Sequence, residues 1–591
     1  MLREIGLASA GACLAARGSS ARPAGPAGAE AGSPALKRSD VVFMYEAKPD
    51  VYAAYGATVL AWGGAPTAER RRAALGVAWH GSVGMVTEFA AYHRRFPQTW
   101  EDGLCRDVRG QPLKVPWLTD QRHEGVPYWW CCTRQPQFRQ FLEERVVQIV
   151  RAGADGVHVD DHLGSSGALF LGACFCGRCI AGFRDHLAAL PAADRGRLAV
   201  SDPAAFDCGS VLRQWLAGAP PAGPARRVQE HPLWRQWSVY QLRAAAAYMQ
   251  ELRALVARTA DRPLPLSANA GLLWANHLAD YRAVDYWSAE TEHEAASSRV
   301  SERPLFAYRL AEAMGRPYAA TATGQDWAFV KETPRSGLVR CWIAGAYAAG
   351  QLLMGPHHQW CYTEEKGTHW YDGPTGAYAP LYRFVRANAP LFDAHETWAD
   401  LAVVMPHRAW AAGRERWLAI GEQLAAANVS WRLVVGGDEV VDKDVTRAEL
   451  ASSRVVLSPA SVELLPADRA VLEALPAAAV VVDSVERALA AVRPVVRVDG
   501  AAPVRVLPRV GPEDVVLHVL NRAYETEPDA VRPLRGVALQ IDRLALGIAQ
   551  AASRARVFVP GAQPVEVAFG ADGRLALDLD GPWAVVQIAR G

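Results

Sequence analysis

The feature that most constrains the fold is a regular alternation of short apolar runs and longer helical patterns between residues 40 and 390. Such alternation is typical of βα units, in which helices cover a parallel sheet. Eight runs can be counted, and eight parallel strands close into a barrel. The expected strands are 41–46, 58–62, 83–88, 156–160, 264–269, 286–290, 317–323 and 351–355.

The rest of the chain predicts two smaller domains, since 591 residues exceed what one hydrophobic core usually serves. A shorter series of strands and helices begins after residue 392 and indicates a flavodoxin-like α/β domain. From about residue 494 short strands alternate with Gly, Asp and Pro turns, as in a β-sandwich. We therefore expect an α/β architecture with these parts: a signal-like or disordered segment at 1–38, a (β/α)₈ TIM barrel with a Cys-rich loop at 39–395, a flavodoxin-like α/β domain at 396–492 and a C-terminal β-sandwich at 493–591.

Charge and hydropathy argue against two classes of partner. Lys and Arg number 63 against 62 Asp and Glu, so the chain lacks the basic excess of a protein that binds nucleic acid. No apolar run reaches the roughly 18–20 residues that span a bilayer, so no membrane role is expected. An apolar stretch at 5–16 behind Arg3 predicts either an export signal, which places the protein in the periplasm or outside the cell, or the disordered tail of a cytoplasmic protein.

Asp160 and Asp161 follow directly on the fourth expected strand, in the segment Gly-Val-His-Val-Asp-Asp-His at 156–162. Alternation along the strand places His158 and Asp160 on one face and two valines on the other. The valines suit packing against the outer helices, so the polar face should point into the barrel. Asp160 is therefore expected at the inner rim, where barrel enzymes carry catalytic groups. Asp161 is either a second catalytic candidate or the cap of the next helix.

Glu290 takes the equivalent position at the end of the sixth expected strand. Tyr286, Ser288 and Glu290 share one face of that strand, which places the glutamate at the inner rim as well. Glu292 is next in the same phase but already lies in the following loop. It is either a further catalytic candidate or a solvated loop residue.

Two carboxyl groups that face each other across a barrel mouth are what glycoside hydrolysis requires. One protonates the leaving oxygen, and the other attacks the anomeric carbon or activates water. We assign Asp160 as nucleophile and Glu290 as acid/base, with retention of configuration, so the expected partner is an oligosaccharide, polysaccharide or other glycoside and no organic cofactor is needed. Further polar and aromatic side chains near strand ends are expected to bind the sugar: Glu46, Trp62, His80, Glu88, His158, Asn269, Gln325, Asp326, Trp327 and His357.

A C-x-C-x-x-C motif follows the fourth strand, at Cys174, Cys176 and Cys179, with Cys132 upstream of it. Four thiolates form a closed tetrahedral zinc site. Disulfides are the alternative if the chain is exported. We expect structural zinc on these four cysteines and regard the others, including Cys105, as small apolar fillers.

The segments 130–139, 159–164 and 174–184 resemble the barrel of the glycoside hydrolase family 42 β-galactosidases. The resemblance implies a zinc cluster made of one upstream cysteine, matched by Cys132, and the C-x-C-x-x-C motif. It also implies that the α/β domain at about 399–490 corresponds to that family's trimerisation domain and precedes a β-sandwich. A homo-oligomer, either a dimer or a trimer, is compatible with that domain.

The catalytic residues of that family have no counterpart. The family places Asn-Glu at the end of strand four, where this chain has Asp161 and His162, and a nucleophilic glutamate on strand seven, where this chain has Thr-Ala-Thr-Gly-Gln-Asp-Trp at 321–327. β-Galactosidase activity is therefore not implied. An aspartate on strand four with an acid on strand six instead resembles α-galactosidase and α-fucosidase type barrels.

Two other functions are compatible with the same residues. One is a carbohydrate-binding pseudoenzyme, because the family glutamates are missing. The other is a metal-dependent barrel hydrolase, whose ligands would come from His158, Asp160, His162, His80, His357 and His358.

Overall fold

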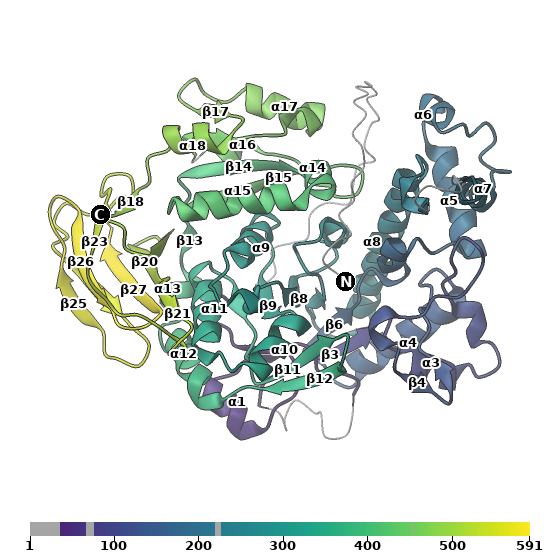
Figure 1. Ribbon diagram of the computed structural model, residues 1–591, viewed down its shortest axis with the longest axis horizontal. Helices are drawn as coiled ribbons and strands as arrows, with labels where there is room; N and C mark the ends of the chain where they lie inside the picture. Colours follow the sequence, from purple (N-terminus) through teal and green to yellow (C-terminus); the bar gives the residue numbers. More distant parts are fainter. Residues whose placement is uncertain (1–35, 67–75, 219–225, 452, 591) are drawn as a thin grey trace.

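The computed structural model describes residues 36–66, 76–218, 226–451 and 453–590 (Figure 1). Eight parallel strands lie in the order β1-β2-β3-β6-β7-β8-β9-β10. The ring closes where the backbone N–H of Gly355, just after the last strand, donates a 2.7 Å hydrogen bond to the carbonyl of Val42 in the first. The predicted barrel is confirmed. Its strands are β1 (Val42–Phe43), β2 (Val59–Leu60), β3 (Ala78–Gly84), β6 (Gly156–Asp160), β7 (Leu266–Ala268), β8 (Tyr286–Thr291), β9 (Tyr318–Ala322) and β10 (Leu352–Leu353).

The third strand differs from the prediction. It covers Ala78–Gly84 rather than 83–88, and its register pairs His80 with Gly156 and Gly84 with Asp160. The segment 83–88 instead contains the end of the strand and the turn that follows. Met85 and Val86 are buried in that turn and Val83 in the strand end before it, so the segment gives the same apolar signal as a whole strand.

Helices surround the barrel and connect its strands (Figure 1). In α4, three apolar side chains at helical spacing, Phe138, Phe141 and Leu142, are buried against the sheet, which is why this segment forms an amphipathic helix. The helices are α1 (Pro49–Tyr55), α3 (Phe89–Arg95), α4 (Pro136–Arg151), α5 (Gly177–Ala189), α6 (Ala192–Arg197), α7 (Cys208–Ala217), α8 (Trp234–Thr259), α9 (Arg303–Ala313), α10 (Gly324–Glu332), α11 (Ser336–Ala348), α12 (Thr375–Ala387) and α13 (Pro390–Asp393).

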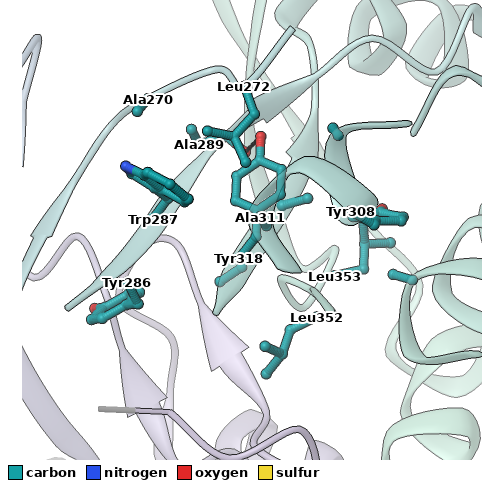
Figure 2. Close-up of a cluster of buried hydrophobic side chains, with 14 of the residues drawn as sticks. Ala270, Leu272, Tyr286, Trp287, Ala289, Tyr308, Ala311, Tyr318, Leu352 and Leu353 are labelled. Carbon is teal, nitrogen blue, oxygen red and sulfur yellow. Dashed lines mark hydrogen bonds between the residues drawn. The ribbon is translucent and has the colours of Figure 1, made fainter. Parts of the chain in front are cut away.

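Packing between β8, β9 and α9 fills the outer layer of the barrel (Figure 2). Trp287 and Ala289 are fully buried and alternate along β8 with the residues that face the barrel interior. Tyr308 of α9 packs against Tyr318 of β9, with ring centroids 6.2 Å apart. Strand β8 is therefore held from outside by apolar contacts, which fixes the direction of its inward side chains.

Two further units follow the barrel (Figure 1). A parallel sheet in the order β15-β14-β16-β17 forms the α/β unit, and two antiparallel sheets pack face to face around an apolar core in the C-terminal unit. The first contains β14 (Leu401–Pro406), β15 (Trp431–Gly436), β16 (Val455–Leu457), β17 (Val480–Val482), α14 (His407–Ala412), α15 (Arg414–Ala426), α16 (Arg447–Leu450), α17 (Pro466–Glu473) and α18 (Val485–Ala491). The second contains β13 (Glu396–Thr397), β18 (Val496–Val498), β19 (Val504–Val510), β20 (Asp514–Asn521), β23 (Leu534–Ile541), β24 (Arg554–Phe558), β25 (Val565–Ala568), β26 (Arg574–Leu579) and β27 (Trp583–Ala589).

Three short hairpins extend from these units. Two belong to the barrel loops: β4 (Arg122–His123) pairs with β5 (Val126–Pro127), and β11 (His358–Thr363) pairs with β12 (Gly367–Asp372). The third pairs β21 (Tyr524–Glu525) with β22 (Ala530–Val531). Within the described ranges, no helix is both long enough and apolar enough to cross a bilayer. The predicted signal stretch at 5–16 lies outside the described residues.

Candidate active site

Asp160 ends the fourth barrel strand and is fixed by two donors. The side-chain amide of Asn269, just after β7, donates a 3.0 Å hydrogen bond to Asp160 Oδ1. The backbone N–H of Asp161 donates to the same oxygen at 2.9 Å. Burial raises the pKa of Asp160, whereas both hydrogen bonds act in the opposite direction by stabilising the carboxylate. The sequence placed Asp160 and Asn269 at strand ends, and the structure brings their side chains into contact.

Glu290 reaches the same place from β8. The side-chain amide of Asn269 acts on this carboxyl group too and lowers the pKa of Glu290, so one amide stands beside two acidic groups. Burial has the largest effect on Glu290 and the negative charge of Asp160 the second largest, and together they raise the pKa of Glu290 to about 7. The two inward carboxyl groups predicted from strand alternation therefore interact electrostatically across the barrel mouth.

Asp161 and Glu88 add acidic groups beside this pair. Asp161 has a left-handed backbone, with φ of 50°, which aspartate tolerates better than most residues. Burial raises the pKa of Asp161 well above its usual range, and the negative charges of Asp160 and Glu290 raise it further. Glu88 lies 3.5 Å from Arg145, and burial raises its pKa despite that partner. The barrel mouth thus gathers carboxyl groups that cannot all be ionised at neutral pH.

Trp62 provides an aromatic surface beside the acidic groups. Its indole N–H donates a 2.8 Å hydrogen bond to Ser288 Oγ on β8, and its ring stacks on His158 with centroids 4.7 Å apart. His158 is fully buried and bonded through Nδ1 to Ser267 Oγ at 2.9 Å. The prediction that His158 contacts substrate is wrong, because Trp62 covers it. Its role is to support the tryptophan ring.

A second aromatic group was missed by the sequence analysis. Trp370, on the β11–β12 hairpin after the last barrel strand, remains 39% exposed and stacks on His358 with centroids 4.5 Å apart. Tyr45 lies edge-on to both Trp370 and Trp62. Burial raises the pKa of Tyr45 and the two carboxyl groups on β6 and β8 raise it further, which places this phenol beside them. This aromatic surface comes from a hairpin that is far in sequence from the acidic residues, so no local sequence pattern indicated it.

A buried histidine–aspartate pair lies next to the acidic group on β6. His162 Nδ1 and Asp280 Oδ2 are 2.6 Å apart, and the ring of His277 meets His162 edge-on at 5.1 Å. The neighbouring His162 lowers the pKa of Asp160. This pair stands where the resemblance would have placed a catalytic Asn-Glu, so a different set of groups surrounds the fourth strand.

Several predicted sugar contacts are structural instead. His80 lies at the opposite end of the barrel, where its Nδ1 and Tyr286 Oη are 2.6 Å apart, because the third strand begins earlier than expected. Asp326 accepts hydrogen bonds from the backbone N–H groups of His293 and Ala295 and caps α10. Trp327 is 1% exposed and packs within the core, so it cannot form a sugar platform.

The remaining predicted residues lie at the surface or in ion pairs. Glu292 points to Arg303, whose guanidinium lies 3.2 Å from it and which also pairs with Glu415 of the α/β unit. This ion pair fits the alternative of a loop residue, since the Glu292 carboxylate ties its loop to Arg303, which in turn contacts the neighbouring unit. Glu46 and Gln325 are exposed, whereas His357 is half-buried beside the first strand, with its ring 6.3 Å from that of Phe43.

The four cysteines of the predicted zinc site come together. Their sulfur atoms lie within 4.8 Å of one another, and Cys132 Sγ is 3.6 Å from Cys176 Sγ and 3.7 Å from Cys179 Sγ. These separations exceed the ~2.05 Å of a disulfide and match the about 3.8 Å edge of a tetrahedron of Zn–S bonds. Cys105 is fully buried in the apolar cluster around these cysteines, beside Cys132 and Cys174, and is not one of the four converging thiols.

The ligand set required by the metal-dependent alternative is not assembled. Its histidines are engaged elsewhere: His158 with Ser267, His162 with Asp280, and His80 at the far end of the barrel. In the described part of the chain, metal-ligating side chains converge at the cysteine cluster and at a group formed by His93, His123 and Glu124. The barrel mouth instead gathers carboxyl groups beside aromatic rings.

Comparisons with known proteins agree with this architecture. No family model matches the chain. Among curated proteins it is similar to an alpha-agarase from Thalassotalea agarivorans, with 24% identity over 68% of this chain, and to an alpha-agarase from Alteromonas agarilytica, with 22% identity over 82% of this chain. The chain spans only 29% and 37% of the length of these two relatives.

Among solved structures the chain resembles two β-galactosidases. The enzyme from Bacillus circulans sp. alkalophilus superposes with a TM-score of 0.62 and 12% identity, covering 93% of this chain and 99% of that one. A family 42 β-galactosidase from G. stearothermophilus superposes with a TM-score of 0.60 and 10% identity, covering 93% of this chain and 98% of that one. The chain therefore has the fold of the family 42 β-galactosidases, as the resemblance in its sequence implied.

Proposed function

We propose that this chain is a glycoside hydrolase that cleaves an O-glycosidic bond with Asp160 as nucleophile and Glu290 as acid/base. The observation that carries the proposal is the amide of Asn269, which donates a hydrogen bond to Asp160 and also lowers the pKa of the neighbouring Glu290. Two acidic side chains from non-adjacent strands thus face the same point above the barrel. The alpha-agarase relatives and the fold of the β-galactosidases support the same class of reaction.

The environments of the two groups assign their roles. Asp160 receives two hydrogen bonds that stabilise its ionised form. Glu290 has a pKa of about 7, so a large fraction of it carries a proton near neutral pH. Different pKa values in a neighbouring pair separate the base or nucleophile from the acid.

The reaction would proceed in two displacements. The Asp160 carboxylate attacks the anomeric carbon while Glu290 gives its proton to the glycosidic oxygen, so the bond to the leaving sugar breaks and a glycosyl ester forms. Glu290, now ionised, takes a proton from water. That water attacks the same carbon and releases Asp160, with net retention of configuration.

The aromatic groups indicate a sugar polymer as substrate. Trp62 and the exposed Trp370 flank the acidic pair and offer flat apolar faces of the kind that pack against pyranose rings. The relatives are alpha-agarases, so we propose an agar-type galactan with an α-linkage at the cleaved bond. The missing family glutamates make a β-galactoside the less suitable substrate.

Assays on agarose and on aryl α- and β-glycosides test the proposal. Asp160→Asn and Glu290→Gln should each lower kcat by about 10²–10⁴-fold, whereas Glu292→Gln, two residues further along the same segment, should stay within a few-fold of wild type. The anomer released first, followed by NMR, should keep the configuration of the substrate. Sugar binding without turnover on every substrate would instead indicate a pseudoenzyme and contradict the proposal.

We also propose that Cys132, Cys174, Cys176 and Cys179 bind one structural zinc ion. The tetrahedral spacing of the sulfurs and their burial support it. Such an ion would tie the start of α5 to the segment before α4 and so hold the loops around β6. Elemental analysis should find one tightly held zinc that Cys176→Ser/Cys179→Ser removes and Cys341→Ser retains. Activity that persists in a mild chelator would fit this role and argue against a catalytic metal.

A further inference from the structure

Two histidines and a glutamate converge in the long loop after β3, apart from both the acidic pair and the cysteine cluster. His93 lies on α3, His123 ends β4, and Glu124 begins the turn of the β4–β5 hairpin. Their ligand atoms lie within 4.8 Å of one another. His93 Nδ1 is 3.9 Å from one oxygen of Glu124, and His123 Nε2 is 3.7 Å from the other.

Hydrogen bonding does not account for this arrangement. Both N···O separations exceed the 2.7–3.2 Å of a protein N–H···O bond. His93 Nδ1 and His123 Nε2 are both buried and lack a hydrogen-bond partner among the described residues, and the His93 residue as a whole is only 8% exposed. Two buried ring nitrogens without a partner raise the free energy of the folded state. The geometry therefore indicates a group between them that accepts their lone pairs.

A metal ion satisfies these groups. Two bonds of about 2.1 Å at a tetrahedral angle separate donor atoms by about 3.4 Å, so the 3.9 and 3.7 Å separations between the histidines and Glu124 are a few tenths of an ångström longer than coordination requires. Imidazole with one carboxylate is a donor set that favours zinc and similar transition metals over calcium or magnesium. We propose that His93, His123 and Glu124 bind one Zn²⁺-class ion, with water completing its coordination.

The surroundings show what such an ion would do. The ring of His93 is held by Phe89 and Trp100, with centroids 5.9 and 5.2 Å away, so α3 presents a preformed ligand. The other two ligands come from the hairpin, and Glu124 extends toward solvent with its side chain 66% exposed. Metal binding would therefore fasten the β4–β5 hairpin to α3. The segment just before that hairpin touches the β11–β12 hairpin, which carries Trp370.

Zinc-binding capacity of the full-length protein tests the proposal. The wild type should hold two zinc ions per chain at buffered micromolar free zinc, one in the cysteine cluster and one here. His93→Gln/His123→Gln should hold one fewer, and His231→Gln, a histidine outside both clusters, should hold as many as the wild type. With Co²⁺ as probe, the double variant should lose the nitrogen-ligand absorption bands and keep the thiolate-to-metal bands.

The exposed ligand provides a test that does not depend on the buried rings. Glu124→Gln should fold normally by circular dichroism and weaken binding of the second zinc by at least about tenfold, because even outer-shell changes weaken metal sites by 10–100-fold. Added Zn²⁺ should also raise the Tm of wild type more than that of Glu124→Gln. An unchanged zinc count in the double variant, or unchanged affinity in folded Glu124→Gln, would overturn the proposal.

Discussion

The side-chain amide of Asn269 donates a 3.0 Å hydrogen bond to Asp160 Oδ1, and the same amide lowers the pKa of Glu290 on β8. An amide has two N–H donors, so it can serve two carboxyl groups. Because β7 lies between β6 and β8 in the sheet, a side chain at its end lies beside both. This contact organises the site.

Removing the amide should therefore impair activity and change its pH dependence. Asn269→Ala should lower kcat/KM by on the order of 10–100-fold, because Asp160 loses a positioning hydrogen bond. The amide lowers the pKa of Glu290, so its loss should move the high-pH limb of the kcat/KM profile upward. A rate–pH profile measures both effects. A profile that moves downward would contradict the interaction of the amide with Glu290.

The acid role of Glu290 predicts the form of the wild-type profile. A general acid acts in its protonated form, so kcat/KM should fall as pH rises through about 7. At the low end, activity should fall as Asp160 becomes protonated, at a pH above the usual aspartate range because burial raises its pKa. The two apparent values belong to the interacting pair. Glu290→Gln should lose the high-pH limb, as aryl glycosides with good leaving groups would show.

His162 should influence the pH at which the neighbouring Asp160 loses its proton. His162 lowers the pKa of Asp160, so His162→Gln should shift the low-pH limb of the profile upward. A purely structural role would lower stability without moving that limb. His231→Gln is the matched control, because that histidine packs against Trp215 far from the barrel mouth.

Trp370 should matter for polymers more than for small substrates. Trp370→Ala should raise KM for an agar-type polysaccharide by about tenfold and leave hydrolysis of aryl glycosides within a few-fold, because only the longer chain extends across the hairpin. Trp274→Ala is a suitable control, since this tryptophan is 50% exposed but stacks under Arg414 of the α/β unit. Equal effects on both substrates would place Trp370 outside the sugar path.

Trp327 should act on stability alone. It is 1% exposed, stacks on Tyr371 at 5.2 Å and donates a 2.9 Å hydrogen bond to Thr321 Oγ1. Trp327→Ala should lower the free energy of unfolding by about 3–5 kcal/mol, as for other buried aromatic residues. Denaturant unfolding at a temperature where both proteins are folded measures the change. Gln325→Ala, on the exposed side of the same helix, should have no such effect.

The sequence alone determined the barrel, the two units after it and the inward direction of Asp160 and Glu290. Side chains alternate between the two faces of a strand. When the apolar side chains of a strand are buried on one face, the side chains between them must point to the opposite face. The C-x-C-x-x-C spacing similarly predicted that three of the four thiols lie close together, because these cysteines are only a few residues apart in the chain. Local pattern failed at 83–88, where a buried turn carries the same apolar residues as a strand.

Only the tertiary structure decided which side chains meet. Trp370 and Tyr45 come from opposite ends of the barrel sequence and become neighbours because the first and last strands close the ring. Glu292 follows the inward phase of β8 but leaves the strand and turns to Arg303. Such contacts depend on the closure of the sheet and the paths of loops, which involve residues far apart in the chain. Periodicity describes only neighbours along the chain, and for that reason it could not show them.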